Sequence, residues 1–157
     1  MKFSNIFLGE NVTVDPSTSI NNAAIQSNVK ISKRCSIYGS PENILEIGES
    51  TYVGMNTILN GYSAKLTIGK RVSVAQNVNI MVDSGPNASP ELQKIYPIIK
   101  ESVEIGDDSW IGANVIVMPG VRLGKFCVVA ANSFVNQSFD DYSLIAGSPA
   151  KLIKKIK

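Results

Sequence analysis

Aliphatic residues recur at every sixth position in the C-terminal third of this 157-residue chain. A strand repeats its faces every two residues and a helix about every 3.6, so neither element by itself explains a period of six. The same register extends back to residue 8 with short interruptions. It comprises eighteen positions in six groups of three: Leu8, Val14, Ile20; Ile25, Ile31, Ile37; Ile47, Val53, Leu59; Ile68, Val74, Ile80; Ile105, Ile111, Val117; Leu123, Val129, Val135.

The residues around each of these positions describe a short strand followed by a sharp corner. Two positions earlier the side chain is usually small or β-branched, as at Val29 and Cys35, and residues i−2 and i share one face of a strand. Three positions later, Asn, Asp or Gly tolerates the left-handed backbone of a corner. This repetition predicts an all-β fold, a parallel β-helix of about six triangular coils. The nine corner residues of these types are Asn11, Asn28, Asn56, Asn77, Asp83, Asp108, Asn114, Gly120 and Asn132.

Interruptions of the register fall between one group of three and the next, after Ile20, Ile37, Leu59 and Ile80. We therefore expect the irregular loops to emerge at the same corner of the β-helix, stacked along its axis. The longest is the loop at residues 81–102, which is rich in proline. A long excursion from a regular scaffold is commonly functional.

The segment 140–157 is expected to cap the last coil, because a repeat fold leaves its end open unless something covers it. Leu152, Ile153 and Ile156 predict a short amphipathic C-terminal helix, with its lysines facing solvent. A chain of this length, 44% hydrophobic, suffices for one continuous core. Residues 1–157 are therefore predicted to form a single domain.

Composition narrows the classes of function. The chain has fifteen Lys and Arg and thirteen Asp and Glu, so its net charge is +2. This small charge gives no reason to expect a nucleic acid as partner. No apolar run approaches the roughly 18 residues of a membrane span. The chain has only two cysteines, Cys35 and Cys127, and does not begin with a secretory leader pattern. Both observations favour a reduced, cytoplasmic protein. The chain contains no histidine, so the commonest metal ligand and general base is missing, and no metal site is expected.

Three motifs carry a family resemblance: IGDDSWIGANV at residues 105–115, MPGV at 118–121 and GSPAK at 147–151. With the repeat, they resemble the hexapeptide-repeat acyltransferases, in particular the sugar acetyltransferases related to galactoside and maltose acetyltransferase. The resemblance implies a left-handed β-helix and a homotrimer. It also implies that acetyl-coenzyme A lies in a groove between neighbouring subunits, with the long loop of one subunit reaching across to the next.

The resemblance also implies a coenzyme site. The expected positions along the coenzyme channel are Trp110, Gly112, Ala113, Ala131 and Ser133, where backbone groups could bond the pantetheine amides; the alternative is that the glycine and alanines are ordinary repeat residues. The expected contact to the 3′-phosphate is Lys151, whose alternative is a solvated tail lysine.

The chain departs from the family at two places. Relatives usually carry a catalytic histidine in the long loop, and this loop has none. Residues 136–138 read NQS where relatives often have Thr-Lys-Asp, so one basic contact to the nucleotide is missing. Three explanations compete for the missing histidine: a carboxylate replaces it, the acceptor is an amine that needs little help, or catalysis has been lost.

Asp83 is the first candidate for a catalytic carboxylate, because it begins the long loop and lies six positions after Asn77. Asn77 is the second catalytic candidate. The alternative is a plain corner residue, since Asp83 also occupies a corner position. Cys127 could suggest a covalent acyl relay, but its i−2 position favours core packing. Loop polar residues that could bind the acceptor, or simply cap turns, are Ser84, Asn87, Ser89 and Glu91.

The sequence therefore favours an acetyltransferase of polysaccharide biosynthesis that moves an acyl group from acetyl-coenzyme A to a hydroxyl or amino group of a sugar or nucleotide sugar. The alternative is a non-catalytic β-helix that binds a small molecule without chemistry. A third class, the zinc carbonic anhydrases built on the same solenoid, requires three histidine ligands and is excluded.

Overall fold

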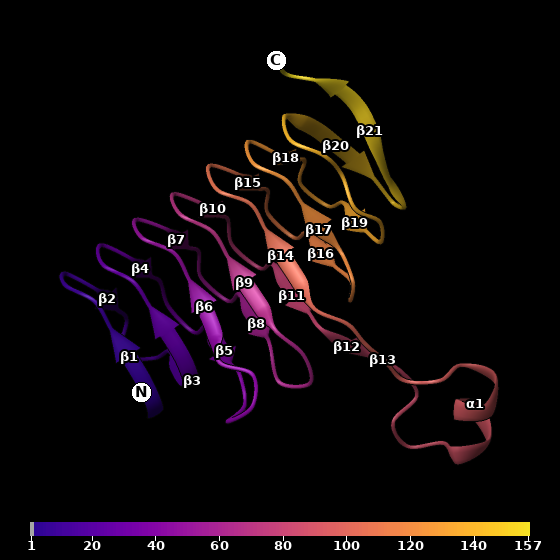
Figure 1. Ribbon diagram of the computed structural model, residues 1–157, viewed down its shortest axis with the longest axis horizontal. Helices are drawn as coiled ribbons and strands as arrows, with labels where there is room; N and C mark the ends of the chain where they lie inside the picture. The colour runs from indigo at the N-terminus through magenta and orange to yellow at the C-terminus, as the bar shows by residue number, and fades with distance from the viewer. Residues whose placement is uncertain (1) are drawn as a thin grey trace.

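The computed structural model describes residues 2–157, which form a parallel β-solenoid of about six coils. Each coil contributes short strands to three flat faces, and the strands of successive coils pair in parallel (Figure 1). The predicted β-helix is therefore confirmed. Face 1 contains β1 (Lys2–Leu8), β6 (Leu45–Ile47), β9 (Leu66–Ile68), β14 (Val103–Ile105) and β17 (Arg122–Leu123).

The other two faces complete the triangular cross-section. Two long strands, β1 and β3 (Ser19–Ile25), bend around a corner and belong to both face 3 and face 1. Face 2 contains β2 (Thr13–Val14), β4 (Lys30–Ile31), β7 (Tyr52–Val53), β10 (Ser73–Val74), β15 (Trp110–Ile111), β18 (Val128–Val129), β20 (Ser143–Gly147) and β21 (Ala150–Lys155). Face 3 contains β5 (Ser36–Tyr38), β8 (Ile58–Asn60), β11 (Asn79–Met81), β16 (Ile116–Val117) and β19 (Phe134–Val135).

The six-residue register forms the core. All of its eighteen positions are buried except Leu8 and Val14, which belong to the first coil and have no further coil covering them. The i−2 positions point inward as well, and both cysteines are among them as free, buried thiols. Burial raises the pKa of Cys35 and Cys127, so neither thiol is activated for nucleophilic attack. The core packing expected for Cys127 is confirmed.

Corners have the backbone that the sequence predicts, with one exception. Eight of the nine expected corner residues have positive φ, from 55° at Asn11 to 84° at Gly120. Asp83 does not: it pairs with Lys100 in a short antiparallel ribbon. The corner alternative for Asp83 is therefore wrong, because the chain leaves the coil there before a corner can form.

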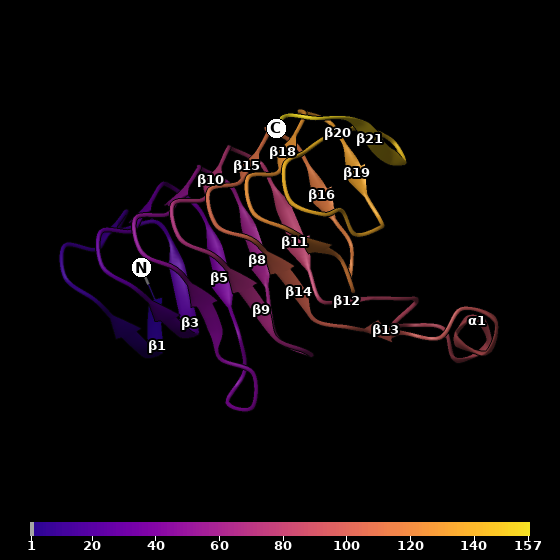
Figure 2. The same ribbon diagram turned by 45° about the horizontal axis from the view of Figure 1, so that its top comes forward.

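All the irregular loops leave the solenoid at one corner, between faces 3 and 1, as predicted (Figure 1, lower edge). The longest forms a projecting arm: β12 (Asp83–Ser84) pairs with β13 (Ile99–Lys100), and the short helix α1 (Pro90–Ile95) forms the tip (Figure 2). The helix is an addition to the prediction. Ser89 caps it by accepting a hydrogen bond from the amide of Leu92, and Pro90 occupies its first turn, where a missing N–H costs nothing.

The predicted C-terminal helix is wrong. Residues 143–155 instead form an antiparallel hairpin, β20 and β21, which turns at Gly147 with φ of 113°. Without a partner on its outer side, β20 would have an edge of unpaired N–H and C=O groups. A returning strand pairs with that edge, whereas a helix lying over it would leave the same groups without partners. Among the residues that the structure describes, no helix is long and apolar enough to cross a membrane.

Candidate active site

An apolar groove runs along face 2 toward its corner with face 3, where the resemblance places the coenzyme. Four of the predicted residues line it: Trp110, Gly112, Ala113 and Ala131. The groove encloses about 480 Å³, and Trp110, one of its lining residues, is 58% exposed. The remaining lining residues are Ala75, Val128, Val129, Ala130 and Leu144.

Small residues shape this groove. A Cβ atom at Gly112 would lie 2.7 Å from both the amide nitrogen of Ala131 and the carbonyl oxygen of Val129 in the next coil, so only glycine allows the two coils to approach there. At the corner, the amides of Ala113 and Ala131 do not donate to any backbone carbonyl within residues 2–157. Two backbone donors therefore remain for a ligand beside an apolar surface.

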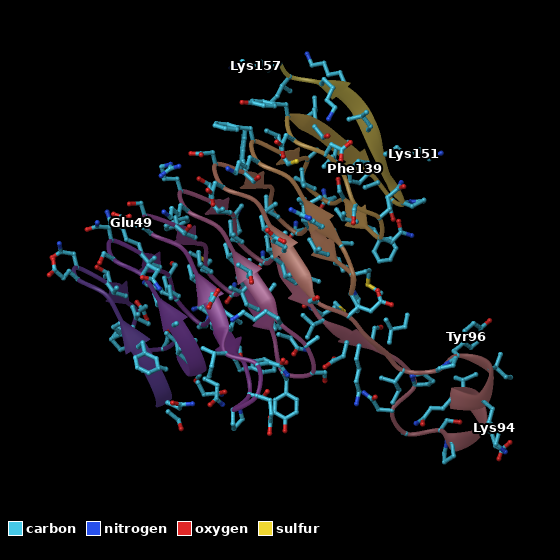
Figure 3. All side chains as sticks on the ribbon, in the orientation of Figure 1. Glu49, Lys94, Tyr96, Phe139, Lys151 and Lys157 are labelled. Atoms are coloured by element: carbon cyan, nitrogen blue, oxygen red, sulfur yellow. The ribbon has the colours of Figure 1, made fainter. Side chains whose placement is uncertain are left out.

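Ser133 does not present its side chain to the groove. The residue is buried, its hydroxyl donates to the carbonyl of Ala130 at 2.7 Å, and it accepts from the amide of Gly147 at 3.2 Å. The Ser133 hydroxyl thus fastens the C-terminal hairpin to the last coil. Lys151 lies on β21 just after the hairpin turn, where its exposed side chain points away from the solenoid (Figure 3).

Asp83 stands at the base of the arm within a cluster of polar side chains from the stacked loops. Asn60 Nδ2 donates to one carboxylate oxygen at 3.1 Å, and Ser63 Oγ donates to the other at 2.6 Å. Tyr38 lies one coil before Asn60 in register. Burial, and secondarily the negative charge of Asp83, raises the pKa of Tyr38, so its phenol is a hydrogen-bond donor at neutral pH.

The sequence reasoning missed Tyr38, Asn60 and Ser63. Their shared feature was available: all three lie where the chain leaves face 3, one or two coils before Asp83. Loops predicted to emerge at one corner should have been expected to exchange hydrogen bonds there.

The four predicted acceptor-binding residues have separate places in the arm. Ser84 belongs to β12, directly after Asp83, and lines a concavity of about 540 Å³ with Tyr96 and Ile99. Asn87 is exposed in the following turn. The other two have local partners: the Ser89 hydroxyl caps α1, and Glu91 pairs with Lys94 at 2.9 Å.

Asn77 and Asp83 are not brought together as a catalytic pair. Asn77 is exposed at the corner between faces 2 and 3, with φ of 57°, and adjoins the groove through Ala75. Asp83 lies at the opposite edge of face 3, beyond β11. Within one chain, the groove and the carboxylate therefore occupy different corners of the triangle.

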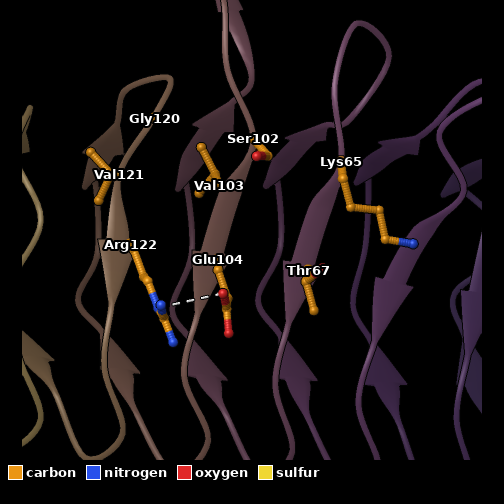
Figure 4. Close-up of a pocket in the computed structure, with 8 residues that line it drawn as sticks. All are labelled: Lys65, Thr67, Ser102, Val103, Glu104, Gly120, Val121 and Arg122. Atoms are coloured by element: carbon orange, nitrogen blue, oxygen red, sulfur yellow. Dashed lines mark ion pairs between the residues drawn. The ribbon is translucent and has the colours of Figure 1, made fainter.

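A further concavity, of about 300 Å³, lies on face 1 (Figure 4). Its charged side chains are already paired: Arg122 lies 3.5 Å from Glu104, and Lys65 lies 3.1 Å from Glu46 on the adjacent strand. Such exposed pairs contribute little and offer no unpaired charge to a ligand. The described residues also contain no group of three or more His, Cys, Asp or Glu side chains arranged to hold a metal ion.

Known proteins share both the repeat and the fold. Residues 102–137 match the family model described as bacterial transferase hexapeptide (six repeats). Galactoside O-acetyltransferase of Escherichia coli (strain K12) is 33% identical over 121 residues, which cover 76% of this chain and 58% of that protein. A probable macrolide acetyltransferase of Lysinibacillus sphaericus is 35% identical over 108 residues, covering 58% of this chain and 60% of that protein. The chain therefore spans less than two thirds of the length of these relatives.

Two solved structures extend the comparison. A galactoside acetyltransferase in complex with coenzyme A superposes with a TM-score of 0.74 at 28% identity, covering 87% of this chain and 66% of that one. A mutant of AntD, an N-acyltransferase from Bacillus cereus in complex with dTDP and coenzyme A, gives 0.84 at 25% identity, covering 96% and 83%. The chain is therefore a hexapeptide-repeat protein, homologous to sugar O-acetyltransferases and to an N-acyltransferase.

Proposed function

We propose that this protein transfers an acetyl group from acetyl-coenzyme A to a hydroxyl or amino group of a sugar or nucleotide sugar. The observation that carries the proposal is the groove on face 2, which unites Trp110, Gly112, Ala113 and Ala131 around an apolar floor. Homologues with bound coenzyme A, and AntD with bound dTDP, support the same pair of substrates.

The groove has the chemistry that a pantetheine chain requires. Its apolar walls suit the methylene groups, and the free amides of Ala113 and Ala131 can donate to the pantetheine carbonyls. Lys151 is the proposed contact to the 3′-phosphate of the nucleotide, because an exposed ammonium at the hairpin turn suits a phosphate dianion.

A homotrimer would bring the groove and the acceptor site together. The groove lies at the corner between faces 2 and 3, whereas Asp83 and the arm lie at the corner between faces 3 and 1. The arm extends away from its own solenoid, with Ile95 and Tyr96 exposed near its tip (Figure 2). A neighbouring subunit can cover these side chains, and its groove can then receive the Asp83 cluster.

The reaction follows from this arrangement. The acceptor oxygen or nitrogen attacks the thioester carbonyl, the tetrahedral oxyanion accepts hydrogen bonds from backbone amides, and the C–S bond breaks. The acceptor proton ends on the sulfur of coenzyme A, either directly or through Asp83. A hydroxyl acceptor needs the carboxylate as a base, whereas a neutral amine needs mainly orientation.

A coenzyme-release assay tests the function. The protein, acetyl-coenzyme A and a panel of sugars, amino sugars and nucleotide sugars are combined, and free thiol is measured. Acceptor-dependent thiol release is expected for one class and identifies O- or N-transfer. The competing function is a non-catalytic binding module, favoured by the lack of histidine; coenzyme binding by calorimetry without thiol release for any acceptor would support it. We also propose a cytoplasmic location within polysaccharide biosynthesis, consistent with two free, buried thiols.

A further inference from the structure

The C-terminal hairpin gives one end of the molecule a composition unlike the rest. Strand β21 is the outermost strand of face 2, at the opposite end of the solenoid from the N-terminus (Figure 1). Residues 143–157 include four lysines and neither Asp nor Glu, although the whole chain has a net charge of only +2. The basic residues of this end are Lys151, Lys154, Lys155 and Lys157.

Apolar side chains are exposed between these lysines. Leu152 is 47% exposed, Ile153 59% and Ile156 44%. Leu144 and Ile145, which are consecutive in β20, pair with Lys154 and Leu152, so Ile153 is the extra residue of a β-bulge on β21. A bulge re-aims its side chain away from the regular pleat. Residues 151–157 therefore intersperse exposed aliphatic side chains with lysines, in the order Lys-Leu-Ile-Lys-Lys-Ile-Lys.

The lysines differ in their partners. Lys155 is fixed, because its Nζ donates to the carbonyl of Asp141 at 2.6 Å and to Ser143 Oγ at 3.2 Å. Lys157 lies over the ring of Tyr142 at 5.4 Å. Lys151 and Lys157 stand near opposite ends of β21, and both reach outward (Figure 3). The two acidic residues at the hairpin base, Asp140 and Asp141, are exposed but precede β20, and the Asp141 carboxylate accepts a hydrogen bond from the amide of Lys125 at 2.8 Å.

We propose that this hairpin end binds an anionic lipid surface, with the lysines at the headgroups and Ile153, Leu152 and Ile156 in the interface. A hairpin that carries four lysines and no acidic residue of its own complements anionic lipids, and long lysine side chains can keep their ammonium groups at headgroup level while adjacent aliphatic groups lie deeper. A nucleic acid would use the charge but would leave the aliphatic side chains in water. In a trimer of parallel solenoids, three hairpins would face the same way and strengthen attachment through avidity.

The test is co-sedimentation of the full chain with vesicles of phosphatidylcholine, alone or mixed with phosphatidylglycerol, at low and high salt. Binding is expected only with phosphatidylglycerol and should weaken in salt. Because each basic residue near such a surface contributes about fivefold in partitioning, Lys154→Glu with Lys157→Glu should reduce binding about 25-fold or more. Ile153→Ser should reduce it severalfold with the charge unchanged. Both variants leave Lys151 intact, so coenzyme binding should equal that of the wild type.

A matched control makes the same charge change at the other end of the molecule. Lys30 and Lys33 are exposed near the N-terminal coils, and Lys30→Glu with Lys33→Glu should bind vesicles as the wild type does. Failure to bind phosphatidylglycerol vesicles, or equal loss in the control variant, would overturn the proposal. So would an unchanged affinity in Ile153→Ser together with equally tight binding to a soluble polyanion such as heparin. The outcome is independent of whether thiol release is seen in the acyl-transfer assay.

Discussion

Asp83 is held by two donors, Asn60 and Ser63, and it lies outside the left-handed corner conformation. This environment changes what a substitution there would mean. An Asn side chain fits well at corners such as Asn56 and Asn114, but position 83 is not a corner. Its carboxylate is oriented by neighbouring loops, which is the arrangement that a positioned base or a hydrogen-bond acceptor for the substrate requires.

We expect Asp83→Asn to lower kcat by about 10² to 10⁴ if the carboxylate serves as general base, with coenzyme affinity nearly unchanged. Steady-state kinetics and calorimetry measure the two quantities. Ser63→Ala is the matched control, because it removes one donor and retains the carboxylate. Activity of Asp83→Asn within about threefold of the wild type would eliminate the base role and favour an amine acceptor that needs only orientation.

We expect the ammonium group of Lys151 to contact the 3′-phosphate of coenzyme A. Lys151→Glu should weaken coenzyme A binding by about 1 to 3 kcal/mol, the scale of one charge-assisted contact. Isothermal calorimetry measures the loss, and Lys154→Glu, three positions along the same strand, should leave the affinity unchanged. An equal loss with dephospho-coenzyme A, which lacks the 3′-phosphate, would contradict the assigned contact.

At the scale of the element, each short strand is stable only because the coils above and below it complete its hydrogen bonds and its packing. Ile111 of β15 pairs with Val74 on one side and Val129 on the other, and is fully buried. Coils stacked in this way are stabilised chiefly by contacts with their nearest neighbours. Removing volume in a middle coil therefore affects both adjacent interfaces.

Ile111→Ala should lower the free energy of unfolding by about 2 to 5 kcal/mol, because the neighbouring coils cannot collapse into the cavity. Urea denaturation at a fixed protein concentration measures the change, since assembly would make stability depend on concentration. Lys33→Ala, at an exposed position near the N-terminal coils, should stay within about 0.5 kcal/mol of the wild type. Equal losses in both variants would contradict the assignment of the core.

At the scale of the whole molecule, the three faces differ in charge. The outward side chains of face 3 are uncharged, and Ile58 and Ile116 flank Asn79 in register across three neighbouring coils. Face 1 instead presents Glu104 and Arg122. Face 3 lies between the corner of the groove and the corner of the arm. Because it is uncharged and exposes aliphatic groups, we expect a second subunit to cover it.

Light scattering should therefore give the mass of a trimer at micromolar concentration. Ile58→Glu should shift the mass toward the monomer, because burying an unpaired carboxylate at an interface is costly. Thr13→Glu, which adds the same charge to face 2 next to Lys30, should leave the mass unchanged. A monomeric wild type would contradict the proposed shared active site.

The sequence by itself determined the solenoid, its inward residues, the corner glycine and asparagines, and the common corner of the loops. These features repeat, so a period of six residues reports local geometry that each coil imposes on the next. Only the tertiary structure decided the C-terminal hairpin, the backbone of Asp83 and its contacts with Asn60 and Ser63. The hairpin exists because the last coil has a free edge to pair, and the Asp83 contacts join residues about 20 positions apart that meet only when the coils stack. The repeat pattern predicts that the loops share a corner and that the last coil needs a cover, but it does not specify which side chains bond at that corner or which element pairs with the free edge.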